Sequence, residues 1–157
     1  MEMHQGCLPI IKGCLPGAYR LSAYVREDWF KLYLSDVGLL SSVYGMLVKR
    51  ELLGGTLAGN VKGGLYENFV ASELQRSGFP LRYYKNDSVE VEFMIETDDG
   101  VVPVEVRLKT GRSQSLDRLL ENESIRKGIK LVGGNVGISG KKVTLPHYMA
   151  MFLSPSI

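Results

Sequence analysis

The segment that most constrains the fold is VEVEFMIETDDGVVPVEVRLK, residues 89–109. Apolar and charged residues alternate on both sides of an Asp-Asp-Gly turn signal, which is typical of two antiparallel strands joined by a tight turn. The turn can form at Asp99-Gly100, which is a strong two-residue signal, or one residue earlier at Asp98-Asp99. The segment therefore predicts a β-hairpin in one of two registers.

The register decides which charged side chains of this hairpin are neighbours. Glu92 lies opposite Arg107 in the first register and opposite Glu105 in the second. Both registers place Glu92, Glu105 and Arg107 on one face, unless a bulge or an odd-length loop intervenes. The other face would then carry the core residues Val91, Phe93, Val104 and Val106.

Carboxylates that share one face of a sheet need compensation. Two of them side by side cost roughly 0.2–1 kcal/mol. Arg107 could offset this repulsion, and so could Mg²⁺ or Mn²⁺, since hard cations prefer oxygen ligands. Glu67 or Glu73, both near the apolar stripe of the preceding helix, could add a third acid, and we favour Glu67. The alternative is a wet hairpin face, because charged residues are mostly exposed.

Helix and strand signals surround the hairpin on both sides. An apolar stripe that ends at Gly78 predicts a helix over 62–78. The uninterrupted apolar run at 128–134 predicts a strand buried on both faces, and the helix before it predicts a right-handed crossover to the same sheet. We further expect an irregular lead-in at 1–18, strands at 30–36, at 81–85 and within 140–153, and helices at 37–47 (capped by Asp36) and 115–123.

The positive charge is concentrated in one part of the chain. The net charge is only +2, yet residues 107–142 hold nine Lys or Arg against three Asp or Glu. Lys109, Arg112 and Arg118 could contact phosphates of a nucleic acid, helped by the start of the predicted helix at 115. An ordinary solvated helix start is the alternative.

The cysteines and the apolar runs bear on where the protein works. Cys7 and Cys14 have no second CxxC or His pair nearby, which indicates reduced thiols and not a zinc site. No apolar run approaches the ~20 residues that span a bilayer. Residues 1–6 lack the apolar core of a signal peptide. We therefore expect a cytoplasmic protein without a membrane partner.

The order of these motifs resembles the PD-(D/E)XK superfamily of metal-dependent nucleases. Glu67 in the first helix, Glu92 in the second strand and Glu105-Val106-Arg107 in the third carry that resemblance. From about Leu21 on, the chain also resembles the uncharacterised C-terminal domain of prokaryotic AAA+-like ATPases. The stretches that carry this second resemblance are FKLYLSDVGLL (30–40), GGLYENFVASEL (63–74), VEVEFMIE (89–96), VPVEVRLKTG (102–111), SLDRL (115–119) and NVGISGKKVTLPHYMAMF (135–152).

The resemblance implies an α/β fold with a restriction-endonuclease-like core, made of a helix, a three-stranded antiparallel meander, a crossover helix and a strand. It implies a lead-in and small helical segment over 1–60, which links to an ATPase domain, and a nuclease-like domain over 61–157.

The resemblance also implies a catalytic site. Glu67, Glu92 and Glu105 would bind Mg²⁺ or Mn²⁺, and Arg107 or Lys109 would stabilise the transition state. Two positions depart from the superfamily pattern. Glu92 stands where Asp is usual, and Arg107 stands for the Lys of E-x-K, where arginine keeps the charge but never gives up its proton.

No ATP site is expected in this chain. A phosphate-binding loop needs G-x-x-x-x-G-K-[ST], and the nearest approach is NVGISGKK at 135–142. Asn135 replaces the first glycine of that pattern and Lys142 replaces the Ser or Thr. We predict a turn between strands at this segment.

Two functions compete at this point. The first is a non-catalytic module that serves an ATPase by docking protein or nucleic acid, either DNA or RNA, with a homo-oligomer as a further option. The alternative is a Mg²⁺- or Mn²⁺-dependent DNA or RNA hydrolase that acts through Glu67, Glu92, Glu105 and Arg107.

Overall fold

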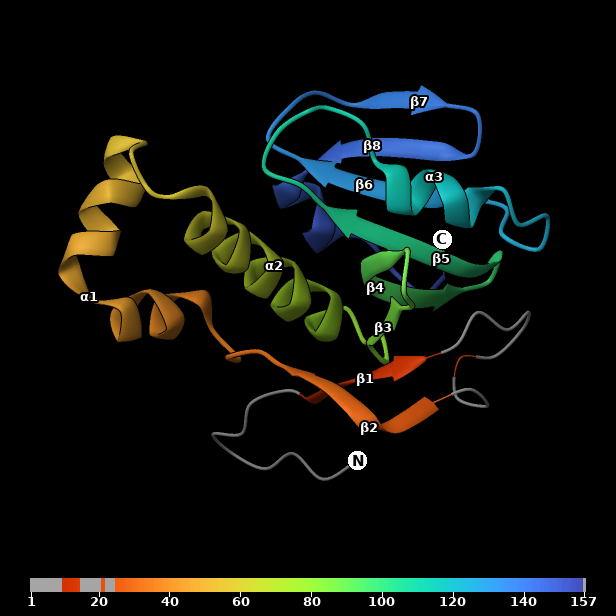
Figure 1. Ribbon diagram of the computed structural model, residues 1–157, viewed down its shortest axis with the longest axis horizontal. Coiled ribbons are helices and arrows are strands. Elements are labelled where there is room, and N and C mark those ends of the chain that lie inside the picture. The colour runs from red at the N-terminus through yellow and green to blue at the C-terminus, as the bar shows by residue number, and fades with distance from the viewer. Residues whose placement is uncertain (1–9, 15–20, 22–24, 157) are drawn as a thin grey trace.

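A computed structural model describes residues 10–14, 21 and 25–156, which form an eight-stranded sheet with helices on both faces (Figure 1). The strand order across the sheet is β2-β1-β3-β4-β5-β6-β8-β7. In chain order the elements are β1 (Ile10–Cys14), β2 (Val25–Leu32), α1 (Val37–Gly54), α2 (Gly59–Arg76), β3 (Arg82–Lys85), β4 (Glu90–Thr97), β5 (Gly100–Val106), α3 (Gln114–Leu120), β6 (Gly128–Val132), β7 (Gly137–Ser139), β8 (Lys142–Pro146) and the 3₁₀ helix η2 (His147–Phe152).

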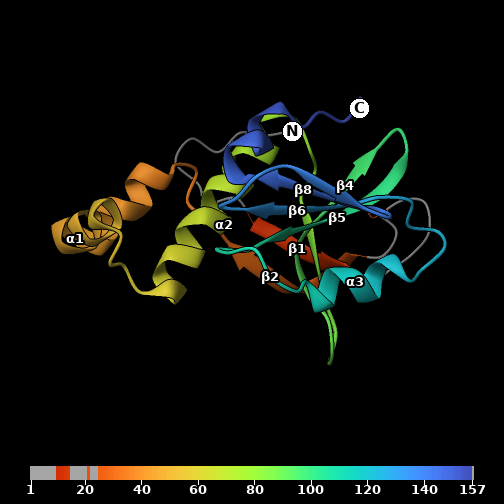
Figure 2. The ribbon, with the colours of Figure 1, turned by 90° about the horizontal axis from the view of Figure 1, so that it is seen from above.

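The core has two parts, one on each face of the sheet. On one face, Val70 and Leu74 of α2 pack against Phe93 of β4. On the other face, Leu119 of α3 packs with Met94 of β4. Figure 2 shows α2 and α3 on either side of the strands, with α1 extending away from them. No helix in the described part of the chain is both long and apolar enough to cross a membrane.

The central part of the sheet confirms several expectations. β3, β4 and β5 form an antiparallel meander, and α3 connects β5 to the parallel strand β6. All five residues of β6 are buried, as the apolar run at 128–134 predicts. β8 adds a further parallel strand beside β6. The NVGISGKK segment contains strand β7 and the Gly140-Lys141 turn that leads into β8, so the predicted turn is confirmed only at its end.

The N-terminal part contributes strands as well as a helix. The predicted irregular lead-in is wrong for residues 10–14, because β1 pairs antiparallel with β2 and parallel with β3. The glycines and prolines around this segment hide the strand, and pairing with distant residues stabilises it. Strands from both sides of residue 60 therefore share one sheet, so the segment before residue 60 is not only helical.

The α1 helix begins as predicted and continues further. The Asp36 side chain accepts a hydrogen bond from the Leu39 backbone N–H at 2.9 Å and caps the first turn. The helix runs on to Gly54 but is kinked at Gly45, whose φ of 85° is open to glycine at little cost. Ser41 is the buried residue of α1, so this helix contributes little to the core.

The hairpin forms in the second of its two predicted registers. Phe93 pairs with Val104 and Thr97 pairs with Gly100, so the loop is Asp98-Asp99 and not Asp99-Gly100. Gly100 has a φ of 110° and resumes the strand directly after the turn. The Asp-Gly signal is therefore real, but its glycine ends the turn instead of forming its centre.

The packing of α2 on the sheet gives a direct stability test. We expect Leu74→Ala to lower the free energy of unfolding by about 2–5 kcal/mol, because Leu74 is fully buried and a cavity would remain. Val136→Ala, at an exposed apolar position, should change it by less than about 0.5 kcal/mol. Urea denaturation followed by circular dichroism measures both, and equal effects would contradict this account of the core.

Candidate functional site

One extra residue in β4 decides where the candidate carboxylates lie. Arg82 pairs with Met94 and Tyr84 pairs with Val91, so two steps along β3 match three steps along β4. Such a β-bulge interrupts the alternation of side chains. Accordingly Val91 and Met94 pack on the α3 face, whereas Phe93 packs on the α2 face. The predicted common face of Val91 and Phe93 is therefore wrong.

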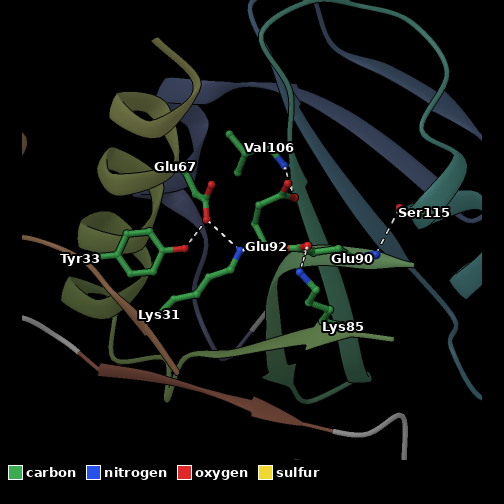
Figure 3. Close-up of polar contacts among 8 residues, drawn as sticks. All are labelled: Lys31, Tyr33, Glu67, Lys85, Glu90, Glu92, Val106 and Ser115. Carbon is green, nitrogen blue, oxygen red and sulfur yellow. Dashed lines mark hydrogen bonds and ion pairs between the residues drawn. The ribbon is translucent and has the colours of Figure 1, made fainter. Parts of the chain in front are cut away.

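The bulge also separates the two hairpin carboxylates. Figure 3 shows the Glu92 side chain on the side of the sheet that faces α2. Glu105 lies between Val104 and Val106, which both pack on the α2 face, so Glu105 points to the α3 face. The prediction that Glu92 shares a face with Glu105 and Arg107 is wrong, because parity holds only in an unbulged strand.

Glu67 of α2 lies in a network of charged side chains (Figure 3). Its Oε1 accepts hydrogen bonds from Lys31 Nζ at 3.2 Å and from the Tyr33 hydroxyl. Lys31 also pairs with Glu90 Oε1 at 3.0 Å, and Lys85 pairs with Glu90 Oε2 at 2.9 Å. Lys31 thus links helix α2 to strand β4 through two carboxylates.

The protonation of this network follows from its partners. Burial acts to lower the pKa of Lys31, but Glu67 and Glu90 outweigh it and the pKa lies above its ordinary value. Burial acts to raise the pKa of Glu90, but hydrogen bonds from Lys85 and Lys31 outweigh it and the pKa lies below its ordinary value. Burial, and then Glu67, raise the pKa of Tyr33, so its hydroxyl stays a donor.

Glu92 has an environment of a different kind. Its Oε2 accepts one hydrogen bond, from the backbone N–H of Val106 at 3.0 Å. Burial is the main reason that the pKa of Glu92 rises to about 7, and the nearby Glu67 adds to the rise. The Val106 N–H and Arg107 act in the opposite direction. Glu92 therefore changes charge near neutral pH, as groups at functional sites often do.

Glu105 is held on the other face of the sheet. It is 0% exposed, and its Oε1 lies 2.6 Å from an Nη of Arg107, which is partly exposed. Glu105 is paired in register with the buried Lys130 of β6, whose Nζ donates to the Gly111 carbonyl. Burial lowers the pKa of Lys130, although attraction to Glu105 opposes that effect. Arg107 therefore pairs with one oxygen of Glu105 and Lys130 adds attraction at longer range, while Oε2 of Glu105 is buried without a hydrogen-bond partner in the described part of the chain.

The three predicted metal ligands do not form one ligand set. Glu67 is hydrogen-bonded to Lys31 and Tyr33 on the α2 face of the sheet, whereas Glu105 is hydrogen-bonded to Arg107 on the opposite face. Within the described ranges, no three His, Cys, Asp or Glu side chains lie together as a group that could hold a metal ion. These residues as placed do not fit a three-carboxylate Mg²⁺ or Mn²⁺ site, since such ions need several oxygens converging on one point.

The predicted phosphate contacts are only partly available. Lys109 and Arg112 are exposed in the loop between β5 and α3. Arg118 is exposed too, but it donates to the Ser88 carbonyl at 3.0 Å. The helix predicted at 115–123 is confirmed in a shorter form, since α3 ends at Leu120.

Three members of the network, Lys31, Tyr33 and Lys85, were missed from the sequence. Lys31 lies at the end of strand β2, and Tyr33 comes two positions later. The alternation of side chains in FKLYLSD could therefore have placed Lys31 and Tyr33 on one face. Nothing local indicates that Glu67 is their shared partner. Glu73, the other acid weighed in α2, instead pairs with Arg76 of the same helix at 2.7 Å.

The raised pKa of Glu92 gives a pH-dependent stability. Between its ordinary pKa of 4.5 and about 7, the folded protein holds a proton that the unfolded chain releases, so stability falls as pH rises. We expect Glu92→Gln, which keeps an acceptor for Val106, to stabilise the protein by about 1–3 kcal/mol at pH 8 and by much less at pH 4.5. Thermal or urea unfolding at both pH values measures this.

The matched control for that substitution is Glu123→Gln, at an exposed position after α3. It should leave the free energy of unfolding nearly unchanged at both pH values. If Glu92→Gln were neutral or destabilising at pH 8, the account of a buried, high-pKa carboxylate would be wrong.

The comparisons with known proteins give one match. The family model described as "Domain of unknown function (DUF4143)" matches residues 62–148, which is more than half of the 157-residue chain. The comparisons with curated proteins and with solved structures found no match. The matched span contains Glu67, Glu92 and Glu105 but begins after α1. The chain belongs to the DUF4143 family.

Proposed function

We propose that this chain is a non-catalytic docking module of a larger AAA+-like ATPase. The observation that carries the proposal is the surface of α1. This helix buries Ser41 and leaves large apolar side chains in solvent, with Val43 77% and Leu53 84% exposed. The exposed apolar residues of α1 are Leu39, Val43, Tyr44, Met46, Leu47 and Leu53.

An apolar surface of this kind is characteristic of a binding site. A helix that is apolar around its circumference is normally buried, and large exposed apolar patches on soluble proteins mark interaction sites. The exposed Phe30 and Leu32 of β2 add to the apolar residues of α1. Figure 1 shows α1 standing apart from the sheet, where a partner can reach it.

The ATPase is the partner that this surface suits best. In the resemblance to AAA+-like ATPases, the helical segment before residue 60 is the part that links to the ATPase, and α1 lies there. The exposed Lys49 and Arg50 of α1 favour an acidic rim on the partner surface. The order α2, β3-β4-β5 meander, α3, β6 supports the further proposal that the rest of the chain is a restriction-endonuclease-like core.

The internal pairing of the acids supports a non-catalytic role. A hydrolase needs carboxylates that are free to converge on a substrate or an ion, whereas Glu67 and Glu105 are each engaged by a cation of this chain. Removing either cation alone would leave its carboxylate partly or fully buried without a compensating charge.

Docking can be tested with the ATPase segment of the full-length protein produced as a separate chain. We expect the two to associate. Val43→Lys and Leu47→Lys should each raise the dissociation constant at least about tenfold, because a buried charge would replace an apolar contact. Isothermal titration calorimetry measures the constant. Val136→Lys, at an exposed apolar residue outside α1, is the control and should bind normally.

Other outcomes would redirect the proposal. Self-association of the isolated chain through α1, seen by analytical ultracentrifugation and lost in Val43→Lys, would identify a second copy as the occupant. Binding to DNA that needs no metal and weakens steeply with salt would indicate nucleic-acid docking through Lys109, Arg112 and Arg118. Either result, without ATPase binding, would contradict the proposed partner.

The hydrolase alternative has its own test. We expect the purified wild-type chain, incubated with supercoiled plasmid and Mn²⁺, to cleave no more than Glu105→Ala does. Unequal cleavage by wild-type protein and Glu105→Ala prepared in parallel would overturn the non-catalytic assignment. Equal cleavage by both would indicate a contaminating nuclease.

A further inference from the structure

A cleft of about 690 Å³ lies between α1, α2 and the ends of two parallel strands. Val132 and Pro146 line it, and these are the last residues of β6 and β8. In open α/β sheets, ligands bind outside the carboxyl ends of parallel strands. The volume also falls in the range of roughly 300–1,000 Å³ that is usual for small-molecule sites.

The lining of the cleft is mainly apolar and aromatic. Tyr66 of α2 stacks on His147, with 4.2 Å between the ring centroids and an interplanar angle of 17°. Gly133 and Gly134 follow β6 and put no side chain into the space. The further apolar lining residues are Val37, Leu52, Leu65, Phe69, Val132 and Pro146.

Glycine allows a close approach where the loop after β6 closes one side of the cleft. A Cβ atom on Gly133 would lie 3.1 Å from the Leu108 carbonyl oxygen, and one on Gly134 would lie 3.0 Å from the Thr110 side chain. Both contacts are tighter than ordinary packing, so a side chain at either position would require its neighbour to shift by a few tenths of an ångström.

The charge of the cleft lining favours a ligand that carries a negative charge. Lys62 is the one charged residue in the lining. Burial lowers the pKa of His147, although its hydrogen bond to the Arg107 carbonyl acts the other way. Nε2 of His147 lies 2.8 Å from that carbonyl oxygen and therefore carries the proton. The imidazole is neutral at pH 7, so the cleft holds a single positive charge.

We propose that this cleft binds a small, largely apolar or aromatic molecule that carries one negative charge, which pairs with Lys62. The apolar and stacked walls take the body of the ligand, and Asn135 and His147 add polar groups to the lining. Val37 and Leu52 of α1 line the cleft, but the exposed apolar side chains of α1 do not, and neither do Glu67 and Glu92. The site therefore uses different side chains from the proposed docking surface.

Two fluorescent probes that differ in charge test the proposal. Anilinonaphthalene sulfonate has an aromatic body and one anionic group, and N-phenylnaphthylamine has a similar body without the charge. We expect both to bind the full chain with a stoichiometry of one. Lys62→Gln should weaken the sulfonate about tenfold, the effect of a lost charge-assisted hydrogen bond, and leave the neutral probe unchanged.

The control variants separate this cleft from the other apolar surface. Lys49→Gln, which removes an exposed lysine of α1, should leave both affinities as in the wild type. Unchanged binding of the neutral probe to Lys62→Gln shows that this variant is folded. If Lys62→Gln binds the sulfonate as tightly as the wild type, or if Val43→Lys abolishes binding of both probes, the proposed site is wrong.

Discussion

A bulge in β4, where Arg82 pairs with Met94 and Tyr84 with Val91, turns Glu92 toward α2 and leaves Glu105 facing α3. Strand side chains normally alternate, so one inserted residue reverses the face of everything on one side of it. Two acids that lie opposite each other in a simple hairpin thus join separate environments. The chemistry available on each face of the sheet follows from that single insertion.

Each environment stabilises its acid in a different way. On the α2 face, Lys31 binds Glu67 and Glu90 together, and Glu92 is left with a backbone donor and a raised pKa. On the α3 face, Arg107 binds a fully buried Glu105. A buried charge is costly unless it is paired, so removing either cation would leave an unfavourable carboxylate behind. Lys31 and Arg107 each engage one oxygen of each acid they bind, whereas Oε2 of Glu105 is buried without a hydrogen-bond partner among the described residues.

The apolar surfaces complement this picture. The sheet is covered on both faces, yet α1 stands apart with its apolar side chains in solvent, and the cleft beside it is lined by apolar groups and Lys62. The α1 surface is broad and suited to a protein, whereas the cleft is concave and suited to a small molecule. The two proposed binding features therefore lie around α1 and the strand ends, away from the acids that first suggest catalysis.

Local patterns in the sequence were sufficient for the elements whose periodicity matches their burial. The α2 helix, the β4–β5 hairpin and the fully buried β6 were predicted because side-chain spacing and apolar content distinguish such elements. Glu67 was also placed correctly at the edge of the buried stripe. The tertiary structure decided how the strands pair. β1 is a strand because it pairs with β2 and β3. The bulge forms because β4 has one more residue than β3 between two paired positions. Those contacts join residues far apart in the chain, and no local pattern encodes which side of a sheet a carboxylate will face once a neighbour shifts the register.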